Sequence, residues 1–186
     1  MRNLKYENYS LIVLLLSLLL VFLLYPFFSG FVHSNIVLKL FISVVVVAAV
    51  IATTHRKFNL IVVSVLGAFA LGTSWCELYH DSLAWVTVSL LFDIFFLGYV
   101  VWVNLVKILT TMNVTKNLLF GAICIYLLIG LLMSFIYVLI DLYYPNSFNV
   151  VLTPISHGHF SIEREFFHYI YFSFVTLTTL GYGDIR

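Results

Sequence analysis

The chain has 186 residues, of which 63% are hydrophobic and 9% are charged, with a formal net charge of +1. A soluble globular domain carries about 25% charged residues, so this composition excludes an ordinary soluble protein and indicates a polytopic membrane protein. The small net charge gives no indication of a nucleic-acid partner. The two cysteines, Cys76 and Cys124, lack the spacing of a metal site, and we interpret them as small packing residues.

Five apolar runs follow one another along the chain, each about long enough to cross a bilayer as a helix. We predict transmembrane helices at about residues 9–28, 36–54, 58–75, 83–107 and 117–140. The first run follows two basic residues, as a signal peptide would, but no small-x-small cleavage site comes after it. We therefore expect an uncleaved helix, and the predicted fold class is an all-α membrane protein.

Basic residues occur in alternate segments between these runs. They are Arg2, Lys5, Arg56, Lys57, Lys107 and Lys116. The excess of Lys and Arg in cytoplasmic segments assigns them, and with them the N-terminus, to the cytoplasm. The loops on the opposite side contain Glu77 and a polar stretch from Asp141 to Glu165, which we assign to the outside. Lys39 is the exception, and we expect its side chain to snorkel outward.

Residues 164–178 form a sixth apolar segment, too short to span a membrane. Segments of this length are often re-entrant. We interpret it as a pore helix that descends from the outer surface. The negative end of its dipole would then favour a cation near the middle of the membrane.

The six residues after this segment read Thr179-Leu180-Gly181-Tyr182-Gly183-Asp184. Successive backbone carbonyls can face one axis only if every other residue lies near the left-handed region. Glycine adopts that conformation at little cost, so Gly181 and Gly183 are suited to it. Such a row of carbonyls could replace the water shell of an ion, and we predict a selectivity filter here.

These six residues closely resemble the potassium-channel signature T-x-G-Y-G-D, with Leu180 in place of the usual Val or Ile. Five helices, a pore helix and a filter resemble the front part of a six-helix potassium channel. The resemblance implies that K⁺ is coordinated by Thr179, Leu180, Gly181 and Tyr182. It also implies filter support from Gly183, Asp184, Tyr171 and Phe172. Relatives with a Glu on the pore helix pair it with the filter Asp, but Val175 stands at that position.

The resemblance further implies a four-helix peripheral domain, residues 1–110, and a partial pore domain, residues 111–186. A voltage sensor needs Arg or Lys at every third position of the fourth helix. Residues 83–106 contain neither, and their one charged residue is Asp93. We therefore predict little or no voltage dependence. Asp93 is an intramembrane acid of unknown role, which either acts functionally or forms an interhelical hydrogen bond with Ser43, Ser64 or a tyrosine.

In the family an inner helix follows the filter, whereas this chain ends at Arg186. We expect a truncated chain that conducts little by itself.

The leading prediction is a potassium-channel subunit of the cell membrane, embedded in membrane lipid. It would act as a homotetramer or assemble with complete channel subunits. We expect no enzymatic activity and no cofactor, K⁺ being the permeant ion. The alternative is a non-conducting or regulatory channel-like fragment, and a potassium transporter is a more distant one.

Overall fold

The computed structural model describes residues 2–28, 34–53, 57–79, 82–111, 116–144, 147–148, 162–183 and 185. Within these residues the regular structure consists of six α-helices. They are α1 (Arg2–Phe28), α2 (Ser34–Ala52), α3 (Lys57–Cys76), α4 (Leu83–Thr110), α5 (Lys116–Tyr143) and α6 (Ile162–Leu177). The chain is thus all-helical, as its composition predicts.

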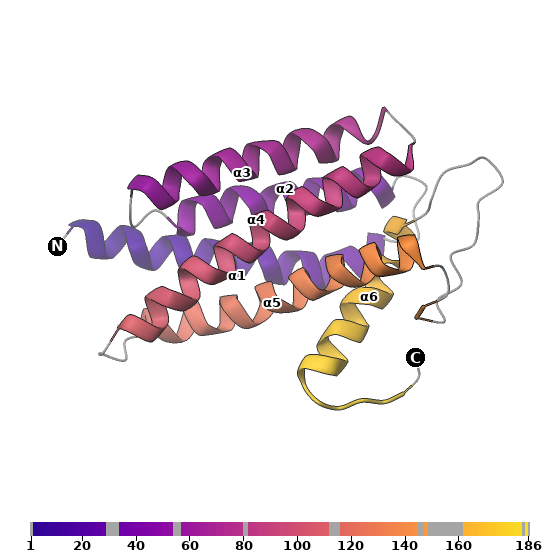
Figure 1. Cartoon of the computed structure of the whole chain (residues 1–186). Coiled ribbons are helices and arrows are strands. Elements are labelled where there is room, and N and C mark those ends of the chain that lie inside the picture. The colour runs from indigo at the N-terminus through magenta and orange to yellow at the C-terminus, as the bar shows by residue number, and fades with distance from the viewer. Residues whose placement is uncertain are drawn as a thin grey trace.

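Helices α1 to α5 run up and down in one bundle (Figure 1). The start of α1, the end of α2, the start of α3, the end of α4 and the start of α5 lie together, at the left in Figure 1. We call this end of the bundle the N-terminal end. Helix α6 begins at the opposite end, beside the end of α5, and runs back obliquely while contacting α5 and α2. The residues after α6 then turn back toward the end of the bundle at which α6 begins.

Each predicted apolar run corresponds to one helix, but several boundaries differ. Helix α2 ends at Ala52 rather than near residue 54, and α4 continues to Thr110 rather than ending near residue 107. Helix α1 begins at Arg2 rather than near residue 9, and α5 continues to Tyr143. An apolar run marks the stretch that suits a hydrocarbon environment, whereas a helix continues through polar residues that keep its backbone hydrogen bonds. The prediction that Asp141 belongs to a polar loop is therefore wrong, because it lies in the last turn of α5.

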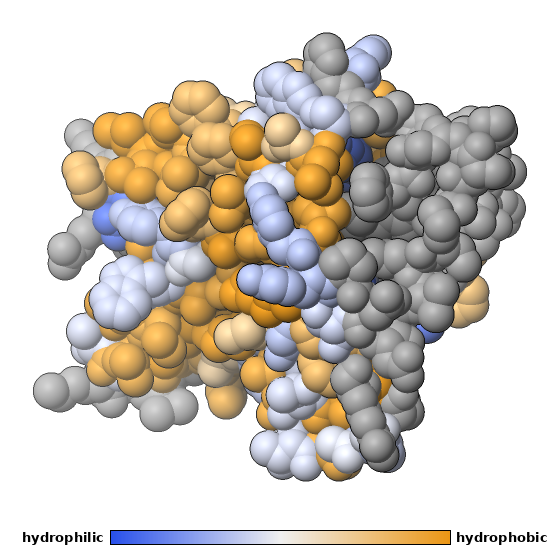
Figure 2. Space-filling model, turned by 45° about the vertical axis from the view of Figure 1, so that its right-hand side comes forward, coloured by the Kyte–Doolittle hydropathy of each residue, from blue (hydrophilic) through white to orange (hydrophobic). Residues whose placement is uncertain are grey.

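Three stretches are long and apolar enough to cross a membrane, namely Phe58–Cys76, Leu83–Thr110 and Leu118–Tyr143. The apolar parts of α1 and α2 within the described residues, Ser10–Leu24 and Ile36–Ala52, are shorter, as is Phe166–Leu177 of α6. Large apolar side chains also cover much of the visible surface of the bundle (Figure 2). Since this exterior suits lipid rather than water, the protein is membrane-embedded.

Buried apolar side chains from all six helices form one contiguous core. Leu14 and Leu18 of α1, Phe96 of α4, Leu128 of α5 and Phe166 of α6 all belong to it. The core joins residues on both sides of position 110, and the predicted division into two domains there stays a prediction. For the site, the consequence is that α6 is packed against the bundle by a buried face.

Candidate functional site

The loop after α6 has an alternating backbone. Thr179, Gly181 and Gly183 have φ angles of 57°, 54° and 71°, all in the left-handed region. Leu180 and Tyr182, which separate them, are outside the set of positive-φ residues. The left-handed conformation predicted for the two glycines is confirmed. The positive φ of Thr179 is a feature that the sequence did not predict.

The amides of this loop are hydrogen-bonded back to α6. Leu180 N and Gly181 N both donate to the carbonyl of Val175, at 3.1 and 3.5 Å. Thr179 N donates to Thr176 O at 3.0 Å. Among the described residues, the carbonyls of Thr179 to Tyr182 accept no hydrogen bond. The loop therefore uses its donors to stay attached to α6 and keeps a row of acceptors available.

The loop lies at the surface of the chain. Leu180 and Tyr182 are 60% and 66% exposed. A Cβ added to Gly181 or Gly183 would meet no atom within 4 Å. The start of the loop is thus held by α6, while the side chains of Leu180 and Tyr182 are largely exposed; Asp184 lies outside the described residues.

The aromatic residues predicted to support the loop are in α6. Phe172 packs against the rings of Tyr137 and Phe148, with centroid distances of 5.0 and 5.3 Å. Tyr171 is half-buried. Within the described part of the chain Tyr182 makes no ring contact with either residue. Support of Tyr182 by these residues would have to come from a neighbouring copy, and it stays a prediction.

Two polar contacts at Asp141, which the sequence did not predict, join α6 and the segment after α5 to the last turn of α5. The Tyr169 hydroxyl donates to Asp141 Oδ2 at 2.7 Å, and Ser147 N donates to Asp141 Oδ1 at 3.0 Å. Asp141 and Tyr169 are 0% and 1% exposed. The sequence does contain a signal for this pair. It is an acid at the end of an apolar run, combined with a tyrosine on the buried face of α6.

A close backbone approach completes the junction of α5 and α6. Ser173 Oγ donates to the carbonyl of Gly130 at 2.7 Å. A Cβ on Gly130 would lie 2.4 Å from the ring of Phe174, so any larger residue at this position requires that ring to move. On α6, Ser173 and Phe174 lie shortly before the 179–183 loop in sequence. Their packing against α5 therefore fixes the position from which the loop begins.

A second polar group lies between α2, α3 and α4, which we call the Lys39 cluster. It consists of Lys39, Ser74, Glu77, Ser89 and Asp93. The Lys39 ammonium is buried, lies 3.2 Å from Glu77 Oε2 and donates to Ser74 O at 2.8 Å. The prediction that Lys39 snorkels outward is therefore wrong, because a carboxylate and a carbonyl satisfy its charge inside the protein.

Asp93, buried in α4, accepts a 3.4 Å hydrogen bond from Ser74 rather than from Ser43, Ser64 or a tyrosine. Ser89 donates to Glu77 at 2.6 Å. A small cavity of about 50 Å³ adjoins the cluster and is also lined by Phe135 of α5 and Phe166 of α6. The cluster thus lies against the start of the buried face of α6.

Comparisons of the chain with protein-family models, with curated proteins and with solved structures found no match. Within the described residues there is also no group of three or more His, Cys, Asp or Glu side chains that could hold a metal ion. A function must therefore be argued from the 179–183 loop and its attachment to α6.

Proposed function

We propose that the chain is a subunit of a potassium-selective ion channel, in which the carbonyls of Thr179, Leu180, Gly181 and Tyr182 coordinate dehydrated K⁺. The observation that carries the proposal is the alternation of positive φ at Thr179, Gly181 and Gly183. Rings of backbone carbonyls that replace the hydration shell are the basis of selectivity in potassium channels. The acceptors left without hydrogen bonds in this loop suit that role.

The conformation of Thr179 adds support. A positive φ in a non-glycine residue costs about 1–3 kcal/mol and is retained mainly where surrounding structure imposes it, often at functional sites. Thr is β-branched, for which such a φ is a marked outlier. A row of carbonyls aimed at one axis is a physical reason for a threonine to adopt it, with its hydroxyl as a further ligand at the inner end.

Selectivity by this loop requires several copies, since one chain offers only one carbonyl at each level of the pore. We propose a homotetramer with the four loops around a common axis. The exposure of Leu180 and Tyr182 is consistent with surfaces that neighbouring copies would cover. Assembly with complete channel subunits would satisfy the same requirement.

For the membrane arrangement we propose five transmembrane helices, α1 to α5, with α6 entering from the outer face and the N-terminus in the cytoplasm of a cell. The alternating helix directions in Figure 1 support this arrangement. The segments that contain Arg56, Lys57 and Lys116 join helices whose adjoining ends lie at the N-terminal end, where the chain also begins. The basic segments would thus all lie on one side of the membrane, the cytoplasmic side.

Voltage is not the proposed stimulus. Moving one charge across the membrane is worth about 2.3 kcal/mol per 100 mV, so steep gating needs several charges on one helix. Helix α4 has no Arg or Lys before Lys107, and Asp93 is hydrogen-bonded to Ser74. We expect a conductance that changes little with voltage.

The proposed ion site is tested by ion-dependent stability of the full chain in lipid nanodiscs. A ligand at one hundred times its Kd stabilises the folded state by about 2.7 kcal/mol, which corresponds to a Tm increase of about 5–10 °C. We expect this increase in K⁺ and not in Na⁺ at equal ionic strength. Chemical crosslinking in the same discs should give tetramers.

The variant Gly181→Ala places a Cβ on a residue with φ of 54° and should abolish the K⁺ response. The matched control is Gly72→Ala, because Gly72 is in α3 and an added Cβ meets no atom within 4 Å. This control should keep the full response. Equal Tm values in K⁺ and Na⁺ for the unmodified chain, or an unchanged response in Gly181→Ala, would contradict the proposal.

A further inference from the structure

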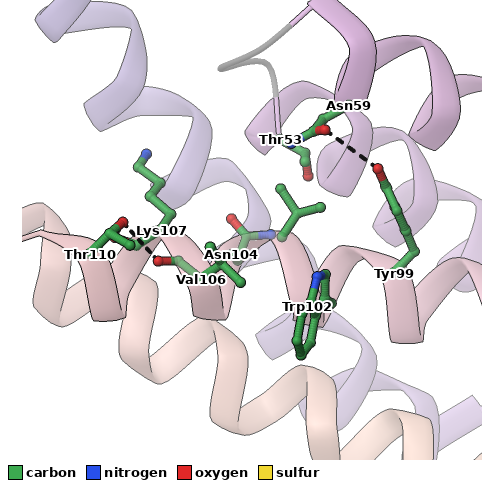
Figure 3. A pocket seen from close by; sticks show the side chains of 9 residues that line it. Thr53, Asn59, Tyr99, Trp102, Asn104, Val106, Lys107 and Thr110 are labelled. Carbon is green, nitrogen blue, oxygen red and sulfur yellow. Dashed lines mark hydrogen bonds between the residues drawn. The ribbon is translucent and has the colours of Figure 1, made fainter.

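A larger and a smaller cavity along α4 differ in how their polar groups are satisfied. The larger one, of about 430 Å³, lies at the N-terminal end of the bundle. There Tyr99 donates to Asn59 at 3.4 Å and the Thr110 hydroxyl donates to Val106 O at 2.8 Å, as Figure 3 shows. The smaller one, of about 50 Å³, borders the Lys39 cluster and is lined by a buried acid that has fewer partners.

This acid, Asp93, is the least satisfied member of the Lys39 cluster. It is 6% exposed, and its Oδ2 accepts one long hydrogen bond, from the Ser74 hydroxyl at 3.4 Å. Within the described part of the chain, Oδ1 accepts no hydrogen bond and the carboxyl group forms no ion pair. An ionised carboxyl buried in this way is costly, and such a group generally takes up a proton instead.

The charges of the cluster indicate which acid carries the proton. Two carboxyl groups share one cation, and the Lys39 ammonium lies 3.2 Å from Glu77 Oε2. Ser89 donates to the same oxygen at 2.6 Å, and the Glu77 side chain is 18% exposed. Glu77 is thus stabilised as a carboxylate. A proton on Asp93 makes the cluster neutral, whereas its loss leaves one net negative charge in a largely apolar site.

The surroundings of Asp93 offer no second cation among the described residues that line the cavity. Helix α2 contributes Lys39, and the turn after α3 contributes Glu77. Helices α5 and α6 contribute only aromatic rings, those of Phe135 and Phe166. The aliphatic part of the wall consists of Leu38, Ile42 and Leu90.

The cavity provides a place from which a proton can be exchanged. A water molecule needs roughly 10–15 Å³ of such space and two or more polar partners, so water fits here. An ammonium has three donors, and Lys39 directs two of them to Glu77 and to Ser74 O. Asp93 is ten residues after Leu83, or about 15 Å along α4. Glu77 lies nearer the end of the bundle at which α4 begins, so it connects the cavity with that end.

We propose that the Lys39 cluster is a proton-binding site, at which Asp93 holds one dissociable proton and exchanges it with water in the cavity. A metal cation is a poorer occupant, because the Lys39 ammonium already places a positive charge beside the cavity. Release of the proton puts a carboxylate near Phe166, so the packing of α6 depends on whether the site is occupied. The proposal does not depend on ion conduction, and its failure would leave the proposed function untouched.

The first test is unfolding of the full chain in nanodiscs without K⁺, in the parent and in Asp93→Asn, which has the same shape but no dissociable proton. In the unfolded chain an aspartate releases its proton near pH 4, roughly, whereas the folded state keeps it. Stability of the parent should therefore fall as pH rises. Between about pH 5 and 7, its unfolding equilibrium constant relative to that of Asp93→Asn should increase about tenfold per pH unit.

Taking this ratio cancels the contribution of the six histidines, which titrate in the same range. A ratio that stays constant with pH would show that Asp93 is ionised in the folded protein, sharing Lys39 with Glu77. That result would overturn the proposal.

Two further variants test the charge balance. Glu77→Gln frees the Lys39 ammonium to compensate Asp93, so the ratio measured in this background should become nearly independent of pH. Asp141→Asn is the matched control, because Asp141 is also buried but accepts hydrogen bonds from Tyr169 and Ser147 N. Its effect on unfolding should be the same across this pH range. A full tenfold dependence in the Glu77→Gln background, or an equal dependence at Asp141, would contradict the proposal.

Infrared spectroscopy detects the proton directly and needs no unfolding. A protonated carboxyl has a C=O stretching band that a carboxylate lacks, and discs of ether-linked lipids contribute no ester carbonyl. At slightly acid pH, isotope-labelled aspartate should give this band in the parent and not in Asp93→Asn. Its absence from the parent would refute the proposal. Exchange of choline chloride for sodium chloride should leave the band unchanged, and its loss in Na⁺ would show that the site takes a metal cation instead.

Discussion

The hydroxyl of Tyr169 donates a 2.7 Å hydrogen bond to Asp141 Oδ2, and both side chains are fully buried between α5 and α6. A hydrogen bond to a charged group contributes about 1.5–3 kcal/mol. This contact joins the last turn of α5 to the buried face of the helix that precedes the candidate filter. The positions of that helix and of the loop after it therefore depend on a pair of residues far from the loop.

We expect Tyr169→Phe to reduce the free energy of unfolding by about 1.5–3 kcal/mol, because it leaves a buried carboxylate oxygen without its donor. The measurement is thermal unfolding in nanodiscs without K⁺. Tyr143→Phe is the matched control, since Tyr143 is exposed and makes a 3.4 Å contact with Thr87. It should change stability by less than about 0.5 kcal/mol. Equal losses in the two variants would contradict a special role for the buried pair.

Gly130→Ala should strongly destabilise the junction of α5 and α6, because its Cβ would lie 2.4 Å from the Phe174 ring. Overpacking of this kind costs about 1–3 kcal/mol or more. Adding Phe174→Leu should recover part of the loss, as measured by unfolding of the double variant. Gly98→Ala, whose Cβ meets no atom within 4 Å, should be neutral or stabilising. Failure of the second substitution to recover stability would show that the ring contact is not the cause.

Lys39→Met should destabilise the bundle by about 1–3 kcal/mol, since it leaves the half-buried Glu77 carboxylate with the Ser89 hydroxyl but without its cation. Lys39→Met combined with Glu77→Met should be considerably more stable than the single variant, because no uncompensated charge remains. A double-mutant cycle on unfolding free energies measures the coupling. A double variant as unstable as the sum of the two single ones would show that the two side chains act separately.

Thr179→Val should weaken the proposed K⁺ stabilisation, while Thr179→Ser should preserve it. Valine keeps the β-branched shape and its strain at φ of 57° but lacks the hydroxyl, whereas serine keeps the hydroxyl. Loss of one ligand of about 1 kcal/mol corresponds to about a fivefold higher K⁺ concentration for the same Tm increase. The measurement is the K⁺ dependence of Tm, and equal behaviour of both variants would exclude the hydroxyl as a ligand.

The sequence predicts much of the fold because apolar runs and glycine conformations are local properties. The run at 83–107 predicts α4 with the correct first residue, and the spacing of Gly181 and Gly183 predicts their left-handed backbone. The membrane environment makes these signals strong. A bilayer leaves helices as the main way to satisfy the backbone in a single chain of this composition.

Contacts between distant helices were not predictable in the same way. Lys39 is in α2 and Glu77 is in the turn after α3, and nothing in their local sequence shows that their side chains come to within 3.2 Å of each other. Asp141 follows an apolar run, so its position suggested a loop, yet a tyrosine 28 residues later makes its burial favourable. The ion-coordinating and filter-support roles of residues 171–184 remain predictions, since they depend on neighbouring copies.

The two hydrogen bonds that Val175 O accepts from Leu180 and Gly181 have a mechanical consequence. They tie the start of the loop to the last turns of α6, so a tilt of α6 about its buried contact at Tyr169 would carry the start of the loop with it. From Tyr169 to Leu177 the helix rises by about 12 Å, so a tilt of about 5° would displace the start of the loop by about 1 Å. Small rotations at the junction of α5 and α6 would thus move the proposed ion-coordinating carbonyls without any conformational change within the loop itself.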